Sequence, residues 1–204
     1  MLEITRLRLN VPARIASVAE GQAGYFTRAQ AAQAGVGDYE LDRAVTYEQI
    51  VRLDTGIYRV VGAAHDPRER LRVAYLRLSP EMTPAERRRG PVVWVSHQSA
   101  ADLHGFGVFL ADTPEFIVDR RRWVNGDMKL YVRSGGVPHR DWVVKDGFAV
   151  TSVIRTAVDL YATHTDQGHI GRFLGDALQA GAATRGELDA QFGTSQVEAT
   201  LAMA

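Results

Sequence analysis

The stretch that decides the fold runs from residue 24 to residue 60 and reads GYFTRAQAAQAGVGDYELDRAVTYEQIVRLDTGIYRV. Within it, Thr27 followed by Gln30 is the pattern of a capping box, which satisfies free backbone N–H groups at the start of a helix. A helix is therefore predicted over residues 28–34, and Gly35 can take the positive φ that ends it. Asp38 is then the predicted N-cap of a second helix.

The second helix has one apolar face, because Leu41, Ala44 and Val45 fall at i, i+3 and i+4. Another helix is predicted to begin earlier in the chain, near Pro12, since proline is favoured at the first helical position. The N-terminal region therefore contains three predicted helices, and the last two are joined by a sharp glycine-containing turn.

A hairpin is predicted directly after these helices. Two β-rich runs, residues 50–53 and 57–61, flank a turn that contains Gly56. Three helices followed by a hairpin are the layout of a winged helix-turn-helix, which holds a short helix where it can enter the major groove of DNA. A domain of this shape can also be purely structural, because fold does not imply function.

Two groups of side chains are predicted to contact DNA if the domain binds it. The recognition helix would present its residues to the major groove, and arginines around it would contact phosphates. The groove residues are Tyr39, Arg43, Thr46 and Tyr47, and the phosphate residues are Arg28, Arg52 and Arg59. Residues 1–62 hold seven arginines and seven acids, so net charge does not favour DNA binding by itself.

The composition of the whole chain is that of a soluble globular protein. It has 204 residues, is 46% hydrophobic and has a formal net charge of zero. The absence of cysteine excludes disulfides, thiol catalysis and cysteine-based zinc sites. Neither a signal peptide nor an apolar run of about 18 residues is found, so we expect a cytoplasmic protein with no membrane partner. No motif for a cofactor is recognised, and none is expected.

The remainder of the chain predicts a small mixed α/β domain. Five strands are expected at residues 92–95, 115–118, 129–132, 142–145 and 148–150. Helices are expected after Ser96, after Ser152, near Gly168 and after Thr184. The predicted fold class is therefore α/β of the α+β type, with a winged helix-turn-helix at residues 1–62, a basic connector with a helix at 63–90, and an α/β domain at 91–204.

Four segments, GYFTRAQAAQAGV, TGIYRV, VSHQSAADLHGF and VTSVIRTAVDL, occur in this order between residues 24 and 160. In their order and spacing the chain resembles the AbiEi-type antitoxins of type IV toxin–antitoxin systems. The resemblance implies a winged helix followed by an antitoxin domain that neutralises a cognate nucleotidyltransferase-like toxin. It also implies repression of the protein's own operon through repeated sequences in operator DNA. If the domain binds DNA, we expect inverted repeats bound by two copies, a homodimer on the DNA.

The antitoxin-domain residues are taken from the matching motifs and from one basic cluster. They are Ser96, His97, Ser99, Arg120, Arg121, Arg122, Arg155, Thr156 and Asp159. Arg155 and Asp159 are four residues apart on a predicted helix and are expected to form an ion pair. The chain departs from the family pattern at Glu40 and Asp42, which place acids on the predicted recognition helix.

Catalytic chemistry is weakly indicated. Ser96 and His97 are hydrolase residue types, but the Gly-x-Ser-x-Gly turn is absent, which favours an N-cap serine and a packed histidine. A metal site built from His97, His104 and His139 is possible, but the seven-residue spacing of the first two and the distant third histidine are weak evidence for it. Neither catalytic nor metal-ligating residues are therefore expected.

Three hypotheses remain open from the sequence. The first is a DNA-binding antitoxin and autorepressor, and the second is a purely protein-binding antitoxin with a structural winged helix. The third is a catalytic antitoxin that modifies its toxin, for example as an atypical serine/threonine kinase. That activity would need an atypical site, for which Asp119, Asp127, Lys129 and Lys145 are the candidates.

Overall fold

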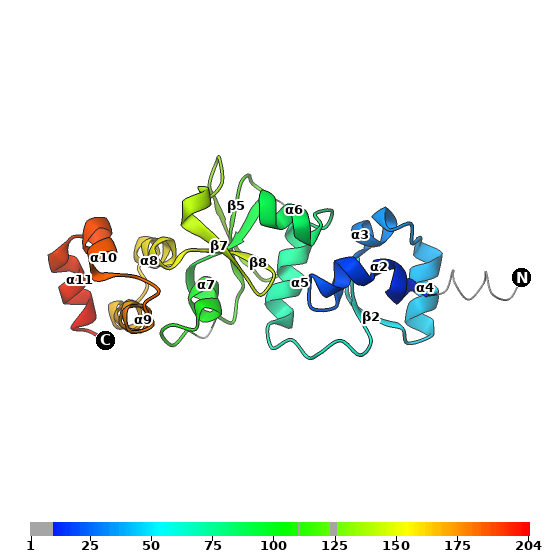
Figure 1. Cartoon of the computed structure of the whole chain (residues 1–204), viewed down its shortest axis with the longest axis horizontal. Helices are drawn as coiled ribbons and strands as arrows, with labels where there is room; N and C mark the ends of the chain where they lie inside the picture. The colour runs from blue at the N-terminus through cyan, green and yellow to red at the C-terminus, as the bar shows by residue number, and fades with distance from the viewer. Residues whose placement is uncertain (1–9, 110, 123–125) are drawn as a thin grey trace, which may run out of the picture. The chain divides into compact units, whose positions relative to one another are not determined.

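The computed structural model describes residues 10–109, 111–122 and 126–204 (Figure 1). The chain divides into two compact units, Met1–Pro91 and Val92–Ala204. Among the described helices, none is long and apolar enough to cross a membrane.

The N-terminal unit contains the predicted winged helix-turn-helix. Its helices are α2 (Val11–Glu20), α3 (Arg28–Gln33) and α4 (Asp38–Thr46), and its hairpin is formed by β2 (Ile50–Asp54) and β3 (Ile57–Val60). The capping box predicted for α3 is present, with the Thr27 hydroxyl accepting from the Gln30 N–H. A strand absent from the sequence prediction, β1 (Tyr25–Thr27), pairs with β3 and completes a three-stranded antiparallel sheet in the order β1-β3-β2.

One apolar core holds these elements together. Ile15 from α2, Leu41 from α4 and Phe26 from β1 are all buried in it. The Phe26 ring stacks on Tyr58 of β3, with 5.4 Å between ring centroids. Val36, in the turn between α3 and α4, is buried in the same core, so the turn is fixed by packing as well as by its glycines. The core therefore fixes the position of α4.

The prediction of Asp38 as N-cap is wrong. Gly37 is the N-cap of α4, and its free N–H donates to the Glu40 carboxylate at 2.9 Å. Asp38 is instead the first residue of the helix, where its carboxylate accepts two hydrogen bonds from the Arg28 guanidinium. The sequence pattern assigns the Asp38 side chain to the cap, but in the structure this side chain pairs with Arg28 of the neighbouring helix.

The region predicted as a separate connector, residues 63–90, is part of the N-terminal unit. It forms α5 (Glu69–Leu78) and α6 (Pro84–Arg89). Arg87 of α6 is buried and donates to the Gln22 side chain and, at 2.6 Å, to the Ser79 carbonyl. The Gln30 side chain of α3 donates to the Met82 carbonyl at 2.6 Å. These buried hydrogen bonds attach the two helices to the winged helix.

The C-terminal unit is built on a five-stranded mixed sheet in the order β6-β5-β4-β8-β7. The strands are β4 (Val93–Val95), β5 (Glu115–Val118), β6 (Lys129–Val132), β7 (Trp142–Lys145) and β8 (Phe148–Thr151). The pairs β4–β8 and β5–β6 are parallel, and the pairs β4–β5 and β7–β8 are antiparallel. Helix α7 (His97–His104) follows β4, and a 3-10 turn, η1 (His139–Asp141), precedes β7.

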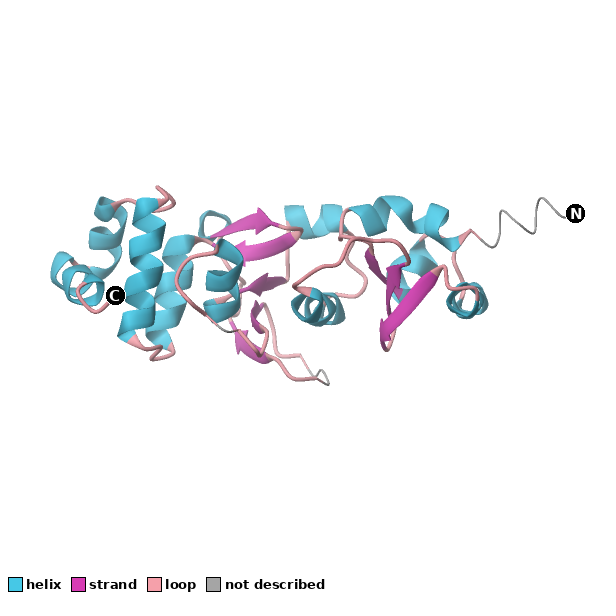
Figure 2. Ribbon diagram, turned by 90° about the horizontal axis from the view of Figure 1, so that it is seen from below, coloured by secondary structure: helices cyan, strands magenta, loops and turns pink. Residues whose placement is uncertain are grey.

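Helices complete this unit, and Figure 2 shows those near the C-terminus packed together. They are α8 (Val153–Ala162), α9 (Gln167–Gln179), α10 (Arg185–Phe192) and α11 (Thr194–Leu201). Phe173 and Leu174 of α9 are fully buried in a core shared with Leu160 of α8. The sequence predicted one short helix after Thr184, whereas the structure has two. Gly171 allows the second of these, α11, to pack closely, because a Cβ there would overlap the Thr200 carbonyl.

Candidate functional site

The exposed face of α4 carries an aromatic–arginine–aromatic stack, which we call the α4 stack and which consists of Tyr39, Arg43 and Tyr47. The two tyrosine side chains are 72% and 59% exposed. The Arg43 guanidinium carbon lies 5.7 Å from the Tyr39 ring centroid and 5.3 Å from that of Tyr47. Arg43 also donates to the Tyr47 hydroxyl at 3.2 Å. Spacing at i, i+4 and i+8 places all three on one helix face, where the rings orient the guanidinium.

The structure thus brings together three of the four residues predicted to face the major groove. The fourth, Thr46, is exposed, but its hydroxyl donates to the Asp42 carbonyl of its own helix at 2.9 Å. This local hydrogen bond occupies the hydroxyl proton. Thr46 is therefore less suited than the α4 stack to donate to a base edge.

Two of the three arginines predicted to contact phosphates lie beside α4 in exposed ion pairs. Arg28 of α3 pairs with Asp38, and the two side chains are 61% and 59% exposed. Arg52 of β2 pairs with Asp42 at 2.7 Å, and these side chains are 50% and 67% exposed. Arg52 also donates to the Tyr58 hydroxyl at 3.3 Å. Both guanidinium groups are accessible, and both hold a carboxylate of α4.

Arg59 is placed differently. Its side chain is only 25% exposed and pairs with Glu69 of α5 at 2.8 Å. Glu69 also accepts from the Tyr25 hydroxyl at 2.7 Å. Neighbouring residues of a strand point to opposite faces, so Arg59 faces away from Tyr58 and from the Arg52 guanidinium beside it. Arg59 thus contributes to the attachment of α5, on the side of the sheet away from α4.

A third acid of α4 has a structural role. Glu40 pairs with Arg14 of α2 at 2.6 Å, and both side chains are largely covered. Glu40 also caps Gly37, while Arg14 donates to the Gly35 carbonyl. This ion pair therefore fixes the turn between α3 and α4.

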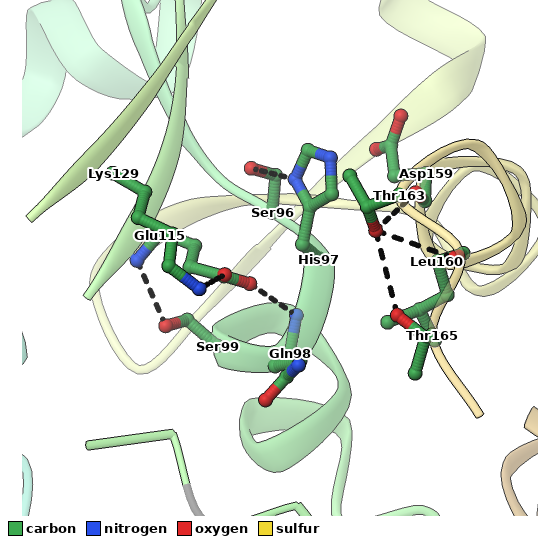
Figure 3. Close-up of polar contacts among 10 residues, drawn as sticks. All are labelled: Ser96, His97, Gln98, Ser99, Glu115, Lys129, Asp159, Leu160, Thr163 and Thr165. Atoms are coloured by element: carbon green, nitrogen blue, oxygen red, sulfur yellow. Dashed lines mark hydrogen bonds and ion pairs between the residues drawn. The ribbon is translucent and has the colours of Figure 1, made fainter. Parts of the chain in front are cut away.

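In the C-terminal unit, residues of the predicted antitoxin-domain motif lie at the carboxyl end of β4 (Figure 3). Ser96 is fully buried and is the N-cap of α7, but its hydroxyl does not cap the helix. Its Oγ instead lies 2.8 Å from His97 Nδ1. The His97 ring stacks on Tyr131 of β6, with 3.7 Å between ring centroids. The predictions of an N-cap serine and of a packed histidine are both confirmed, although the Ser96 hydroxyl makes no capping hydrogen bond.

Glu115, at the start of β5, caps α7 in place of Ser96. Its carboxylate accepts from the Gln98 N–H at 2.8 Å and forms an ion pair with Lys129 at 2.8 Å. Its own N–H donates to Ser99 Oγ at 3.0 Å. Neither Glu115 nor Tyr131 was expected here from the sequence. The only signal for Glu115 was its place at a strand start, and strand pairing that is not readable from the sequence brings it to α7.

The second motif lies on α8, where the predicted ion pair between Arg155 and Asp159 is present. Asp159 is buried, and among the described residues neither its Oδ2 nor Arg155 Nε has a hydrogen-bond partner. Burial raises the pKa of Asp159, and the Arg155 guanidinium opposes that shift. The Thr156 hydroxyl lies 2.8 Å from that of Thr151 and ties α8 to the end of β8.

The basic cluster Arg120–Arg122 is separate from these two motifs. It follows the end of β5, whereas Glu115 begins that strand. Arg122 forms an ion pair with Asp119 at 2.8 Å. The cluster therefore lies at the opposite end of β5 from the start of α7.

Residues considered for catalysis or metal binding are engaged elsewhere. Lys129 is paired with Glu115, and Lys145 donates to the His104 carbonyl at 3.2 Å. Asp119 lies with Arg122 at the far end of β5. Over residues 10–109, 111–122 and 126–204, no three histidine, aspartate or glutamate side chains are grouped as metal ligands would be.

The buried His97 makes stability depend on pH. Burial, followed by the nearby Arg155 and Lys129 charges, lowers its pKa to about 4. Below pH 6.5 the unfolded chain therefore takes up a proton that the folded chain does not, and stability is lost as the pH falls towards 4. Between pH 7.5 and 4.5, His97 is expected to remove about 2.5 kcal/mol from the free energy of unfolding.

Urea unfolding at several pH values checks this expectation. His97→Asn is the control, because asparagine tolerates the positive φ of 51° found at this position. The variant should lose less stability than the wild type over the same pH range. Equal losses in the two proteins would mean that His97 does not titrate as its burial implies.

The fold and the α4 stack define a winged helix-turn-helix protein with an exposed recognition helix. The family model described as "Transcriptional regulator, AbiEi antitoxin" matches residues 13–61, which lie within this domain. The family resemblance stated from the sequence is thereby confirmed. No curated protein matches the chain.

A solved structure with the same fold is the crystal structure of the RV2827C protein from Mycobacterium tuberculosis. It is 12% identical in sequence, with a TM-score of 0.53. The match covers 95% of this chain and 76% of that one. At this identity the likeness shows the fold alone, and it extends over both units.

Proposed function

We propose that the protein is an antitoxin that binds the operator DNA of its own operon and neutralises a cognate nucleotidyltransferase-like toxin. The observation that carries the DNA-binding part is the α4 stack, which lies on the exposed face of the recognition helix beside the ion pairs of two accessible arginines, Arg28 and Arg52. Arginine is the side chain that most often reads guanine in the major groove. The AbiEi family match supports the antitoxin part.

The proposed arrangement on DNA follows from the shape of the domain. Helix α4 enters the major groove with the α4 stack towards the bases, and Arg52 of the wing contacts a phosphate. Two copies bind an inverted repeat, with half-sites about 34 Å apart or a multiple of that distance. Binding in this form represses transcription of the operon, and the protein acts in the cytoplasm.

The salt dependence of binding tests the role of the wing. Removal of one phosphate-binding arginine should reduce the slope of log affinity against log salt by about 0.9, so Arg52→Ala is expected to flatten the slope by that amount. Arg140→Ala is the matched control, because Arg140 is 87% exposed and lies in the other unit. If Arg52→Ala leaves the slope at the wild-type value, the wing does not contact the DNA.

Neutralisation is proposed to occur by binding and to reside in the C-terminal unit. This unit has its own sheet and its own core. The site at the start of α7 offers a buried serine and a lysine already paired with Glu115, which is poorly suited to phosphoryl transfer. The proposal expects a nucleotidyltransferase-like toxin to be encoded beside this protein, and co-expression with that toxin tests it.

The co-expression experiment separates the hypotheses. The wild type and Arg43→Ala should both restore growth, because Arg43 lies outside the C-terminal unit. Loss of neutralisation in Arg43→Ala would show that protection depends on the recognition helix. Mass spectrometry of the rescued toxin should show an unmodified chain, whereas a phosphorylated toxin would establish the catalytic alternative.

A further inference from the structure

The arginines best placed to bind phosphates are both occupied by acids of the recognition helix itself. Asp38 and Asp42 are four residues apart and form a row along α4. Each of them immediately precedes a member of the α4 stack, so the acidic row runs beside the stack, about 100° around the helix. Arg28 reaches this row from α3, and Arg52 reaches it from β2.

These two ion pairs differ from the other pairs around the winged helix. The Arg14–Glu40 pair is 31% and 24% exposed and also fixes a turn, and the Arg59–Glu69 pair is 25% and 37% exposed and attaches α5. In the pairs with Asp38 and Asp42, all four side chains are at least half exposed. Exposed ion pairs of this kind contribute little to stability, and they can exchange partners readily.

When the domain contacts DNA, the carboxylates of Asp38 and Asp42 compete with the DNA phosphates for Arg28 and Arg52. A phosphate that approaches Arg28 or Arg52 must displace the carboxylate, which is then left close to a negative backbone. Binding through phosphates alone is thereby weakened. Only a sequence that also gains base contacts from the α4 stack compensates for the displaced ion pairs, and such a penalty on unwanted partners raises specificity.

We propose that Asp38 and Asp42 are specificity-determining residues that hold Arg28 and Arg52 in exchangeable ion pairs and so suppress binding to DNA of arbitrary sequence. This inference rests on the proposed DNA-binding function. It gives a role to Asp42, one of the two acids that set this recognition helix apart from the family pattern. It also accounts for an arginine-bearing DNA-binding face in a domain whose arginines and acids are equal in number over residues 1–62.

The test is the affinity of the full-length double variant Asp38→Asn/Asp42→Asn for two duplexes over a salt series. One duplex carries the sequence upstream of the protein's own operon, and the other carries a shuffled sequence of equal length. We expect affinity for the shuffled duplex to rise about tenfold or more, with a salt slope steeper by up to about 1.8 for two added phosphate contacts. The preference for the operator should fall.

A matched control removes the same two charges elsewhere. In Asp112→Asn/Glu198→Gln, both acids are exposed and lie in the C-terminal unit. This variant should bind both duplexes as the wild type does. An equal gain in the control would show that only net charge matters, and it would overturn the inference.

A double-mutant cycle separates release of an arginine from loss of a nearby negative charge. Asp42→Asn should strengthen binding to the shuffled duplex in the wild-type background and not in Arg52→Ala. If Asp42→Asn still strengthens binding in the Arg52→Ala background, Arg52 does not exchange Asp42 for a phosphate, and the inference is overturned. If the wild type prefers its operator and the double aspartate variant behaves identically, the inference alone fails. If no protein in the set binds either duplex, the proposed DNA-binding function fails with it.

Discussion

Replacement of Arg43 by alanine is expected to lower affinity for operator DNA by about tenfold to a hundredfold, the loss typical of one bidentate base contact. Arg43 is the only charged member of the α4 stack, and both tyrosine rings lie against its guanidinium. Its loss removes the hydrogen-bond donors from the centre of the exposed face and leaves two rings without their common partner. Fluorescence anisotropy with a labelled operator duplex at fixed salt measures the effect.

Arg43→Lys is the informative companion variant. Lysine keeps the positive charge but lacks the planar fork that stacks between rings and pairs with guanine. Its affinity should therefore lie between those of the wild type and Arg43→Ala. The unfolding midpoint in urea should change little in either variant, because the α4 stack lies on the surface. Wild-type affinity in Arg43→Ala would remove the stack from the interface.

Replacement of Arg87 by alanine is expected to lower the free energy of unfolding by about 3 kcal/mol or more. Arg87 is 3% exposed, and its guanidinium donates to the Gln22 side chain, to Ser79 Oγ and to the Ser79 carbonyl. Its guanidinium carbon also lies 5.4 Å from the Tyr75 ring centroid. Alanine leaves these polar groups buried without partners and opens a cavity between α6 and the winged helix.

The neighbouring residue provides the control for this prediction. Arg88 is exposed on the same helix, and Arg88→Ala should change stability by no more than about 0.5 kcal/mol. Urea unfolding of both variants measures the difference. Similar, small effects in the two would mean that α6 is not an integral part of the N-terminal unit.

The parts of the fold that depend on local chemistry could be predicted from the sequence. The capping box of Thr27 and Gln30 and the apolar face of α4 require only residues close in the chain, and both are present. The strands of the C-terminal sheet were located for the same reason, from short β-rich runs between turn residues. The short strand β1 escaped detection because a three-residue strand has no periodicity of its own, and it exists through its pairing with β3.

The features that the sequence did not predict depend on partners distant in the chain. The Asp38 carboxylate does not cap α4, because it accepts hydrogen bonds from Arg28, ten residues away. The Ser96 hydroxyl lies against His97, and Glu115 takes over the cap of α7 across the β4–β5 pairing. The residues at 63–90 carry a polar and basic composition typical of a connector, yet buried Arg87 makes them part of the first unit.

The candidate DNA-binding site also combines features that are local in the sequence with features that depend on partners distant in the chain. The spacing of Tyr39, Arg43 and Tyr47 is readable from the sequence, because one helix face carries all three. The ion pairs that occupy Arg28 and Arg52, and the partial burial of Arg59 beside α5, are set by tertiary contacts. A count of charges along the chain is therefore a poor guide to the surface that DNA would meet.

The most direct measurement of the central claim is the affinity of the purified full-length protein for its own upstream DNA relative to a shuffled duplex of equal length, at about 0.15 M salt. A recognition helix that reads bases through the α4 stack predicts a preference on the order of 10³-fold, at the low end for specific DNA-binding proteins. That preference should fall by about tenfold to a hundredfold in Arg43→Ala. Equal affinity of the wild type for the two duplexes, or binding to neither, would contradict the claim that α4 reads DNA.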